Sequence, residues 1–111
     1  MKKFGATIRA LREERQISLR KFAEQVGVSP TYQSKVEREE FPPPGEATVK
    51  KIAALLQQDE DFLLGLAGKV ASDLPEIVQE RPQLMATFLR TAGKLSDAQV
   101  EKLLKQMQRM K

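Results

Sequence analysis

The chain has 111 residues, which suffices for one small domain with a short appendage but not for a large multi-layer enzyme. It contains no cysteine and no histidine, so disulfides, thiol nucleophiles, imidazole bases and nearly all zinc sites are excluded. The longest uncharged apolar stretch, residues 62–68, is too short to span a bilayer, and no signal-peptide pattern follows the basic N-terminus. The composition predicts an all-α, cytoplasmic protein that needs no cofactor, does not act at a membrane and is not an enzyme.

The positive charge is concentrated in the first third of the chain. The whole sequence has 19 basic and 15 acidic side chains, a net charge of +4, and residues 1–40 contribute nine basic and six acidic ones. Lysine and arginine that neutralise phosphates release counterions from nucleic acid, so a polyanion is one plausible partner. Ordinary surface charge for solubility is the other explanation, and charge alone does not separate the two.

Apolar spacing and capping residues predict three helices in the first 40 residues. They cover residues 3–15, 19–26 and 30–38. Ser18 can cap the second helix and Gly27 can end it in a left-handed conformation. Ser29 followed by Pro30 is a strong start for the third helix, since the hydroxyl caps it and proline has no N–H to leave unsatisfied.

A rigid connector and further helices follow. Residues 42–45, Pro-Pro-Pro-Gly, cannot lie inside a helix because each proline lacks a backbone donor. Beyond it a helix is expected over 46–57, and Asp59 caps another that Gly68 ends. Two short amphipathic helices over 74–81 and 83–92 follow, with Gly93 as a C-terminal cap. Ser96 and Gln99 form a capping box that opens a last helix to about residue 109.

The helix over 30–38 has an unusually polar surface. Thr31, Gln33, Ser34, Lys35 and Arg38 leave it only a thin apolar stripe of Tyr32 and Val36. An α-helix fits the major groove of DNA, where such side chains reach base edges and phosphates. A short helix that merely lies on the protein surface is the alternative, and the spacing does not decide between them.

Three segments carry a resemblance: FAEQVGVSPTY at 22–32, SKVER at 34–38 and TVKKIA at 48–53. Together they resemble the lambda-repressor-like, Cro-type helix-turn-helix regulators, also called the xenobiotic-response-element family. The resemblance implies a five-helix DNA-binding domain over residues 1–68, followed by a helical C-terminal region over 69–111. It also implies a sequence-specific transcriptional regulator, most simply a repressor, whose partner is double-stranded DNA.

The resemblance assigns roles to individual residues. The base-edge contacts are expected from Thr31, Ser34, Lys35 and Gln33. The phosphate contacts are expected from Ser29, Tyr32, Arg38 and Arg20, although the ring of Tyr32 can equally pack inward. Family members pair an arginine of the first helix with a glutamate late in the third, which corresponds to a structural ion pair between Arg12 and Glu37.

The sequence departs from the family pattern at three positions. Gln33 stands where the family usually has Leu or Ile, so it either points toward DNA or weakens the packing of its helix. Glu39 replaces a common glycine, and a left-handed cap there is strained by about 1 kcal/mol. Leu19 takes the place of a phosphate-contacting glutamine. The connector over 39–44 carries no basic residue, so it is not expected to contact the DNA backbone or the minor groove.

The C-terminal region is expected to mediate assembly, since one such domain contacts only a few base pairs and specificity normally comes from a dimer. The proposed homodimer contact is the apolar stripe of the last helix: Val100, Leu103, Leu104 and Met107. The same stripe can instead pack against residues 74–92, or form a surface for another protein. The alternative function is therefore an antitoxin or adaptor whose tail binds a toxin partner. The short tail also resembles that of repressors cleaved by a regulatory metallopeptidase, which places such cleavage between residues 70 and 95.

Overall fold

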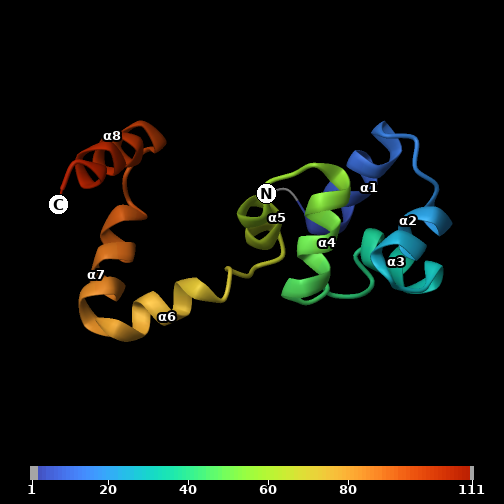
Figure 1. Cartoon of the computed structure of the whole chain (residues 1–111), viewed down its shortest axis with the longest axis horizontal. Helices are drawn as coiled ribbons and strands as arrows, with labels where there is room; N and C mark the ends of the chain where they lie inside the picture. The colour runs from blue at the N-terminus through green and yellow to red at the C-terminus, as the bar shows by residue number, and fades with distance from the viewer. Residues whose placement is uncertain (1–2, 111) are drawn as a thin grey trace. The chain divides into compact units, whose positions relative to one another are not determined.

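The computed structural model describes residues 3–110, and within them the chain forms eight α-helices and no strand (Figure 1). The prediction of an all-α protein is confirmed. The chain divides into two compact units, with the boundary between Ala71 and Ser72. The first unit contains α1 (Phe4–Glu14), α2 (Leu19–Val26), α3 (Pro30–Glu37), α4 (Glu46–Leu56) and α5 (Glu60–Leu66). The second contains α6 (Asp73–Glu80), α7 (Pro82–Ala92) and α8 (Asp97–Gln108). None of the helices within residues 3–110 has the length and apolar character needed to cross a membrane.

The helix starts follow from side-chain caps. The side-chain oxygens of Ser18, Ser29, Asp59 and Ser96 each accept a hydrogen bond from the backbone N–H three residues ahead, at 2.9–3.2 Å. Each bond satisfies one of the N–H groups that a helix leaves free at its first turn. The side-chain oxygen of Gln99 in turn accepts a hydrogen bond from the Ser96 backbone N–H, so the predicted capping box is confirmed. Gly93 caps α7 as expected, but with right-handed backbone angles.

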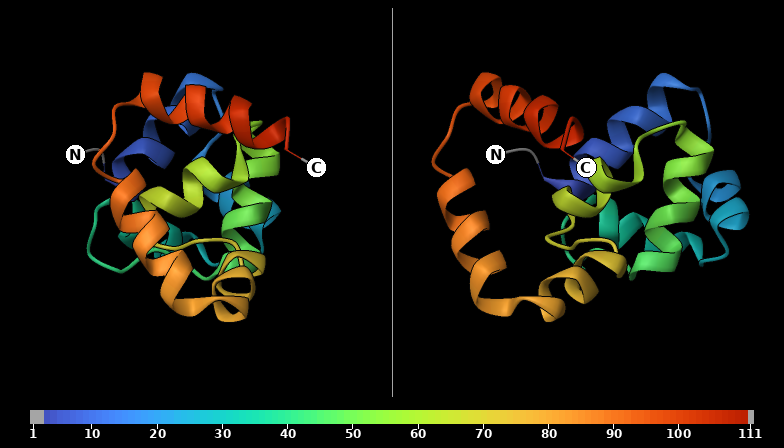
Figure 2. Two further views of the ribbon diagram at one scale, coloured as in Figure 1. Left: turned by 90° about the vertical axis from the view of Figure 1, so that its left-hand side faces the viewer. Right: turned by 60° about the vertical axis from the view of Figure 1, so that its left-hand side comes forward.

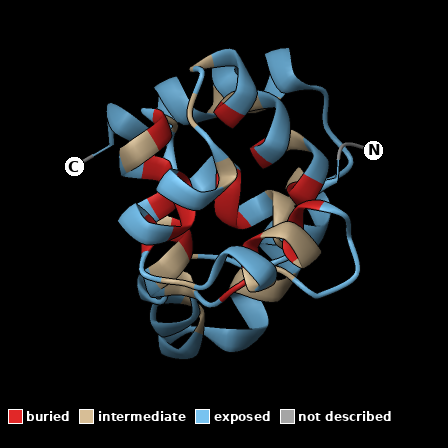
Figure 3. Ribbon diagram, turned by 90° about the vertical axis from the view of Figure 1, so that its right-hand side faces the viewer, coloured by how far each residue is buried: buried red, intermediate tan, exposed pale blue. Residues whose placement is uncertain are grey.

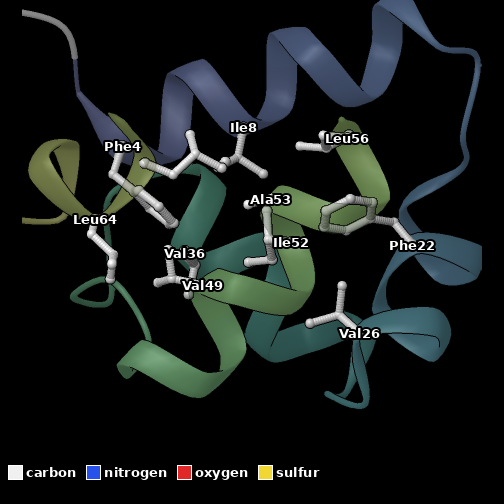
Figure 4. Close-up of a cluster of buried hydrophobic side chains, with 11 residues drawn as sticks. Phe4, Ile8, Phe22, Val26, Val36, Val49, Ile52, Ala53, Leu56 and Leu64 are labelled. Carbon is white, nitrogen blue, oxygen red and sulfur yellow. The ribbon is translucent and has the colours of Figure 1, made fainter. Parts of the chain in front are cut away.

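The hydrophobic core of the first unit takes side chains from all five of its helices (Figure 4). Its fully buried large side chains include Ile8 from α1, Phe22 from α2, Ile52 and Leu56 from α4, and Leu63 from α5. The buried positions lie where these helices face one another, as Figure 3 shows in red. Burying a side chain of this size contributes about 1.5–3 kcal/mol, so this cluster is what holds α2 and α3 in place.

The N-terminus of α1 packs closely against the end of α3. A Cβ on Gly5 would lie 2.2 Å from the backbone oxygen of Val36, so only glycine fits there. Glu39 follows α3 with a φ of 64°, the left-handed conformation expected for the glycine it replaces. Its carboxylate accepts a hydrogen bond of 2.9 Å from the Ala6 N–H. Because Lys3 gives α1 no side-chain cap, the Glu39 carboxylate serves as the acceptor for the first turn of α1. This bond offsets the backbone strain at Glu39.

The second unit is built differently, because its helices enclose no fully buried core. Among its described residues, 72–110, no side chain is buried. Within the unit, α6 runs into α7 at Arg81, and a loop at 93–96 joins α7 to α8 (Figure 2). Leu84 is 68% exposed, and Leu104 and Met107 on α8 are 47% and 39% exposed. Val100 and Leu103 on the same helix are partly buried, so the predicted stripe of α8 is only partly covered within this unit.

Candidate nucleic-acid interface

The α2 and α3 helices form a helix-turn-helix held by short-range contacts. Gly27 ends α2 with a φ of 90°, a left-handed value that glycine adopts without strain. Its N–H and that of Val28 both donate to the Ala23 oxygen, at 2.9 Å each, which closes the end of α2. Ser29 then caps α3, and Pro30 occupies its first turn. The sequence from Ala23 to Pro30 thus fixes the turn between the two helices.

One face of α3 packs against the core. Gln33, Val36 and Glu37 are its buried residues, spaced three and four positions apart as expected for one face of a helix. Gln33 is only 2% exposed, and its side-chain amide donates a 2.9 Å hydrogen bond to the Glu37 carboxylate. The prediction that Gln33 contacts base edges is therefore wrong. Burial of Gln33 carries little penalty because its side chain is hydrogen-bonded. Every buried side-chain nitrogen and oxygen among residues 3–110 likewise has a hydrogen-bond partner.

A buried ion pair fixes the orientation of α3 against α1. Arg12 donates from Nε to Oε2 of Glu37 at 2.9 Å and from Nη2 to Oε1 at 2.8 Å. A third bond of 2.8 Å runs from its Nη1 to the Ile17 oxygen. The two parallel bonds suit the planar guanidinium, and donating them to Glu37 raises the pKa of Arg12 above its ordinary value, although burial opposes this. All three guanidinium nitrogens of Arg12 thus donate to oxygens of the protein itself.

The opposite face of α3 points outward. Thr31, Lys35 and Arg38 are spaced four and three residues apart, on the side away from the buried residues. Thr31 and Arg38 are exposed, whereas Ser34 and Lys35 are partly buried. Thr31, Ser34 and Arg38 border a shallow hollow. The hollow is completed by Leu19 at the start of α2 and Pro30, so the leucine that replaces the family's glutamine supplies apolar surface there.

The residues expected at phosphates lie around the same region. Ser29 and Arg20 are exposed at the starts of α3 and α2. Ser29 accepts a hydrogen bond from the Tyr32 N–H, which leaves its own hydroxyl proton to donate elsewhere. Arg38 forms an ion pair of 3.0 Å with Glu40, with both side chains about half exposed. A pair so exposed to water is worth about 0–1 kcal/mol, so a phosphate can displace it.

Phe41 is a residue of this surface that the sequence did not single out. It lies in the connector after α3, 40% exposed, with the Nζ of Lys35 5.0 Å from its ring centroid. Its ring centroid also lies 5.9 Å from that of Tyr32, which is partly buried. The available signal was a lone aromatic residue between an acidic pair and three prolines.

No group of three or more acidic, histidine or cysteine side chains in the described part of the chain could hold a metal ion. The chemistry that α3 offers is hydrogen bonding and positive charge.

Comparison with known proteins places the chain in a family. A sequence model described as a helix-turn-helix domain matches residues 3–63. The uncharacterized HTH-type transcriptional regulator RghRB of Bacillus subtilis (strain 168) is 34% identical over 80 residues, covering 72% of this chain and 57% of that protein. The HTH-type transcriptional repressor RghR of the same organism is 37% identical over 70 residues, covering 63% and 52%. The chain thus spans little more than half the length of these relatives.

Solved structures with a similar fold include two proteins in complex with DNA. SinR, described as the master regulator for biofilm formation and solved in complex with DNA, is 33% identical with a TM-score of 0.51, covering 55% of this chain and 97% of that one. The P22 c2 repressor with a synthetic operator is 32% identical with a TM-score of 0.53, covering 60% and 98%. A SinR/SinI complex covers 95% and 94% with a TM-score of 0.53, but at 24% identity it shows the fold alone.

The family model, the relatives and the arrangement of α2 and α3 agree. The family consists of DNA-binding transcription regulators, which normally are not enzymes. The chain belongs to the helix-turn-helix family of lambda-repressor-like transcriptional regulators.

Proposed function

We propose that this protein is a sequence-specific repressor that binds a palindromic operator as a homodimer, with α3 in the major groove. The observation that carries the proposal is the division of α3 into a buried face and an outward polar face. The core and the Arg12–Glu37 pair present that face at a fixed angle. SinR and the P22 c2 repressor, which share the fold, were solved with DNA. A cytoplasmic location, beside the DNA of a bacterial cell, follows from the same proposal.

Base contacts are assigned to the outward side chains of α3. Lys35 can donate to O6 or N7 of guanine, and Thr31 offers a hydroxyl or a methyl group. Ser34 lies one turn from Thr31 and borders the hollow, where its hydroxyl serves as donor or acceptor. These three are the specificity residues of the proposal, and Gln33 is no longer among them because it is buried.

Phosphate contacts are assigned to the edges of the motif. Ser29 lies at the N-terminus of α3, where the helix dipole and the free backbone N–H groups favour an anion. Arg20, Tyr32 and Arg38 flank it on α2 and α3. These contacts set the position of the protein on the duplex and add salt dependence, but they do not distinguish sequences.

The experiment is a mobility-shift titration with duplexes selected from a random pool by the intact protein. K35A is expected to relax preference at one base pair by about 1–3 kcal/mol, whereas R38A weakens binding to all sequences alike and reduces the salt slope by about 1. R9A is the matched control, because Arg9 forms an equally exposed ion pair with Glu13 on α1. No retardation at low salt, or equal effects of R38A and R9A, would contradict the assignment.

Dimerisation is assigned to the stripe of α8 formed by Val100, Leu103, Leu104 and Met107. The support is that Leu104 and Met107 are exposed on a helix whose unit buries no side chain among residues 72–110. Exposed apolar patches of this kind mark association surfaces. L104E should lower the sedimentation coefficient to that of a monomer and weaken operator binding. Q106E, an exposed change on the same helix, should do neither.

A second candidate function is an antitoxin or adaptor whose tail binds another protein. The same exposed apolar residues favour it, and a chain of similar fold was solved in a SinR/SinI complex of two different proteins. A toxin partner or a regulatory metallopeptidase acting between residues 70 and 95 fits this candidate. Stoichiometric co-purification of such a partner, lost in L104E while the protein remains monomeric alone, supports it over the homodimer.

A further inference from the structure

We infer that Phe41 is a positioning residue for Lys35 and thereby sets the base preference of the DNA-binding surface. The inference rests on the proposed function, since it concerns how α3 contacts bases. It assigns a specificity role to a connector that carries no basic residue. The observation behind it is that the Phe41 ring and the Lys35 ammonium are already in contact in the free protein, at 5.0 Å from nitrogen to centroid.

The burial of Lys35 points to the ring. Lys35 lies on the outward face of α3 between Thr31 and Arg38, and both of these neighbours are exposed. Lys35 alone among the three is partly buried. The ring of Phe41 lies against it and against Tyr32, the residue one turn earlier on α3. The ammonium of Lys35 therefore lies over the face of the Phe41 ring, which holds the charged end of the side chain at one place on the outward face of α3.

The backbone holds Phe41 in this place. Its N–H and that of Glu40 both donate to the Lys35 oxygen, at 3.2 and 2.8 Å, so the connector turns back over the last turn of α3. Pro42 restricts Phe41 to extended backbone angles, and the buried Pro44 ties the connector to the first unit. The ring is thus presented on a stiff segment rather than on a mobile loop.

The contact has a consequence for DNA binding. A free lysine side chain loses rotamer freedom when its ammonium is fixed at a base edge. A ring that already restricts the side chain reduces this loss, which is the general advantage of preorganisation. A cation–π contact at an exposed site corresponds to about a two- to five-fold change in an equilibrium constant. The ring should therefore strengthen the discrimination that Lys35 provides by a factor of this size.

The experiment is a double-mutant cycle in operator binding, measured by fluorescence anisotropy. The probes are four DNA duplexes. One is selected by the wild-type protein, and the other three carry the remaining base pairs at the position where K35A relaxes the preference. The variants are K35A, F41L and the double change F41L/K35A. F41L keeps an apolar side chain but removes the ring, whereas F41Y keeps an aromatic ring. F62L is the matched control, because Phe62 is a phenylalanine of similar exposure that lies on α5 rather than beside α3.

The expected result is that the loss of discrimination caused by K35A becomes about two- to five-fold smaller in the F41L background. F41Y should behave as wild type, and F62L should leave the K35A effect unchanged. If the role of Phe41 were purely structural, F41L would bind all four duplexes more weakly by the same factor. Equal K35A effects in both backgrounds overturn the inference, and so does tighter binding by F41L, which would mean that the ring withholds the ammonium from DNA.

A second measurement needs no DNA. The ring current of Phe41 should move the ε-methylene proton resonances of Lys35 upfield in the free protein, and the shift should disappear in F41L and persist in F41Y. Absence of the shift in wild type overturns the inference even if DNA binds. Failure of the wild type to bind any selected duplex overturns the proposed function and this inference together, whereas an unchanged K35A effect overturns the inference alone.

Discussion

Replacing Arg12 by methionine tests whether the buried ion pair holds α3 in place. The change removes both bonds to Glu37 and the bond to the Ile17 oxygen. Glu37, itself 5% exposed, would keep only the amide of Gln33 as a partner. Removing one member of a buried pair typically costs about 3–5 kcal/mol, since the remaining charge stays away from water. R12M should therefore lose about 3 kcal/mol of unfolding free energy or more.

The assay is urea unfolding followed by far-UV circular dichroism. With a slope of about 1–1.5 kcal/mol per molar urea for a unit of this size, the midpoint should fall by about 2–3 M. R9M is the control, because the Arg9–Glu13 pair spans 3.6 Å between two side chains that are more than half exposed. Its loss should stay below about 1 kcal/mol.

The double variant R12M/E37L separates charge from packing. With both charges gone, only the Gln33 amide and the Ile17 oxygen lose partners, so the double change should cost less than R12M alone. The reasoning would be refuted if R12M lost no more unfolding free energy than R9M. It would also be refuted if the loss in R12M/E37L equalled the sum of the losses in R12M and E37L.

The pH dependence of this pair has a definite sign. The hydrogen bond of Arg12 to Glu37 raises the pKa of its guanidinium above the ordinary value. A group whose pKa is raised on folding stabilises the protein fully below its unfolded value and loses that contribution only above it. The difference in unfolding free energy between wild type and R12M should therefore stay constant between pH 7 and 10. A decline within that range would show that the guanidinium titrates and that the pair is not intact.

Three further changes test the backbone. G5A should destabilise the first unit by about 1–3 kcal/mol in the same unfolding assay, because its Cβ meets the Val36 oxygen; a neutral result would mean that α1 and α3 can separate freely. Q57G should raise the free energy of unfolding by about 0.5 kcal/mol, and with it the urea midpoint, since Gln57 ends α4 in a left-handed conformation that glycine adopts without strain. A loss of stability would contradict this. S29A should cost about 1 kcal/mol through the cap on Tyr32 and also weaken operator binding, and operator affinity equal to wild type would remove Ser29 from the phosphate contacts.

The boundaries of the helices followed from local chemistry, and so could be predicted from the sequence. A serine or aspartate that caps a helix bonds to a residue three positions ahead, and a glycine turn acts within its own neighbourhood. The all-α fold needed nothing beyond such signals and the spacing of apolar residues. The helix-turn-helix motif needed in addition the resemblance of residues 22–53 to a known family. The places of Arg12 and Glu37 came from the family resemblance, since nothing local joins residues 25 positions apart.

The direction of individual side chains on α3 depended on contacts between distant segments. Gln33 is polar, and its spacing allowed it to face either DNA or the core. It turned inward because the Glu37 carboxylate, held there by Arg12, offered its amide a partner in the interior. Phe41 became part of the outward surface for a similar reason, since the connector bends back over α3 and brings an aromatic ring to Lys35. Burial and partner choice are properties of the packed chain, so local sequence leaves them open.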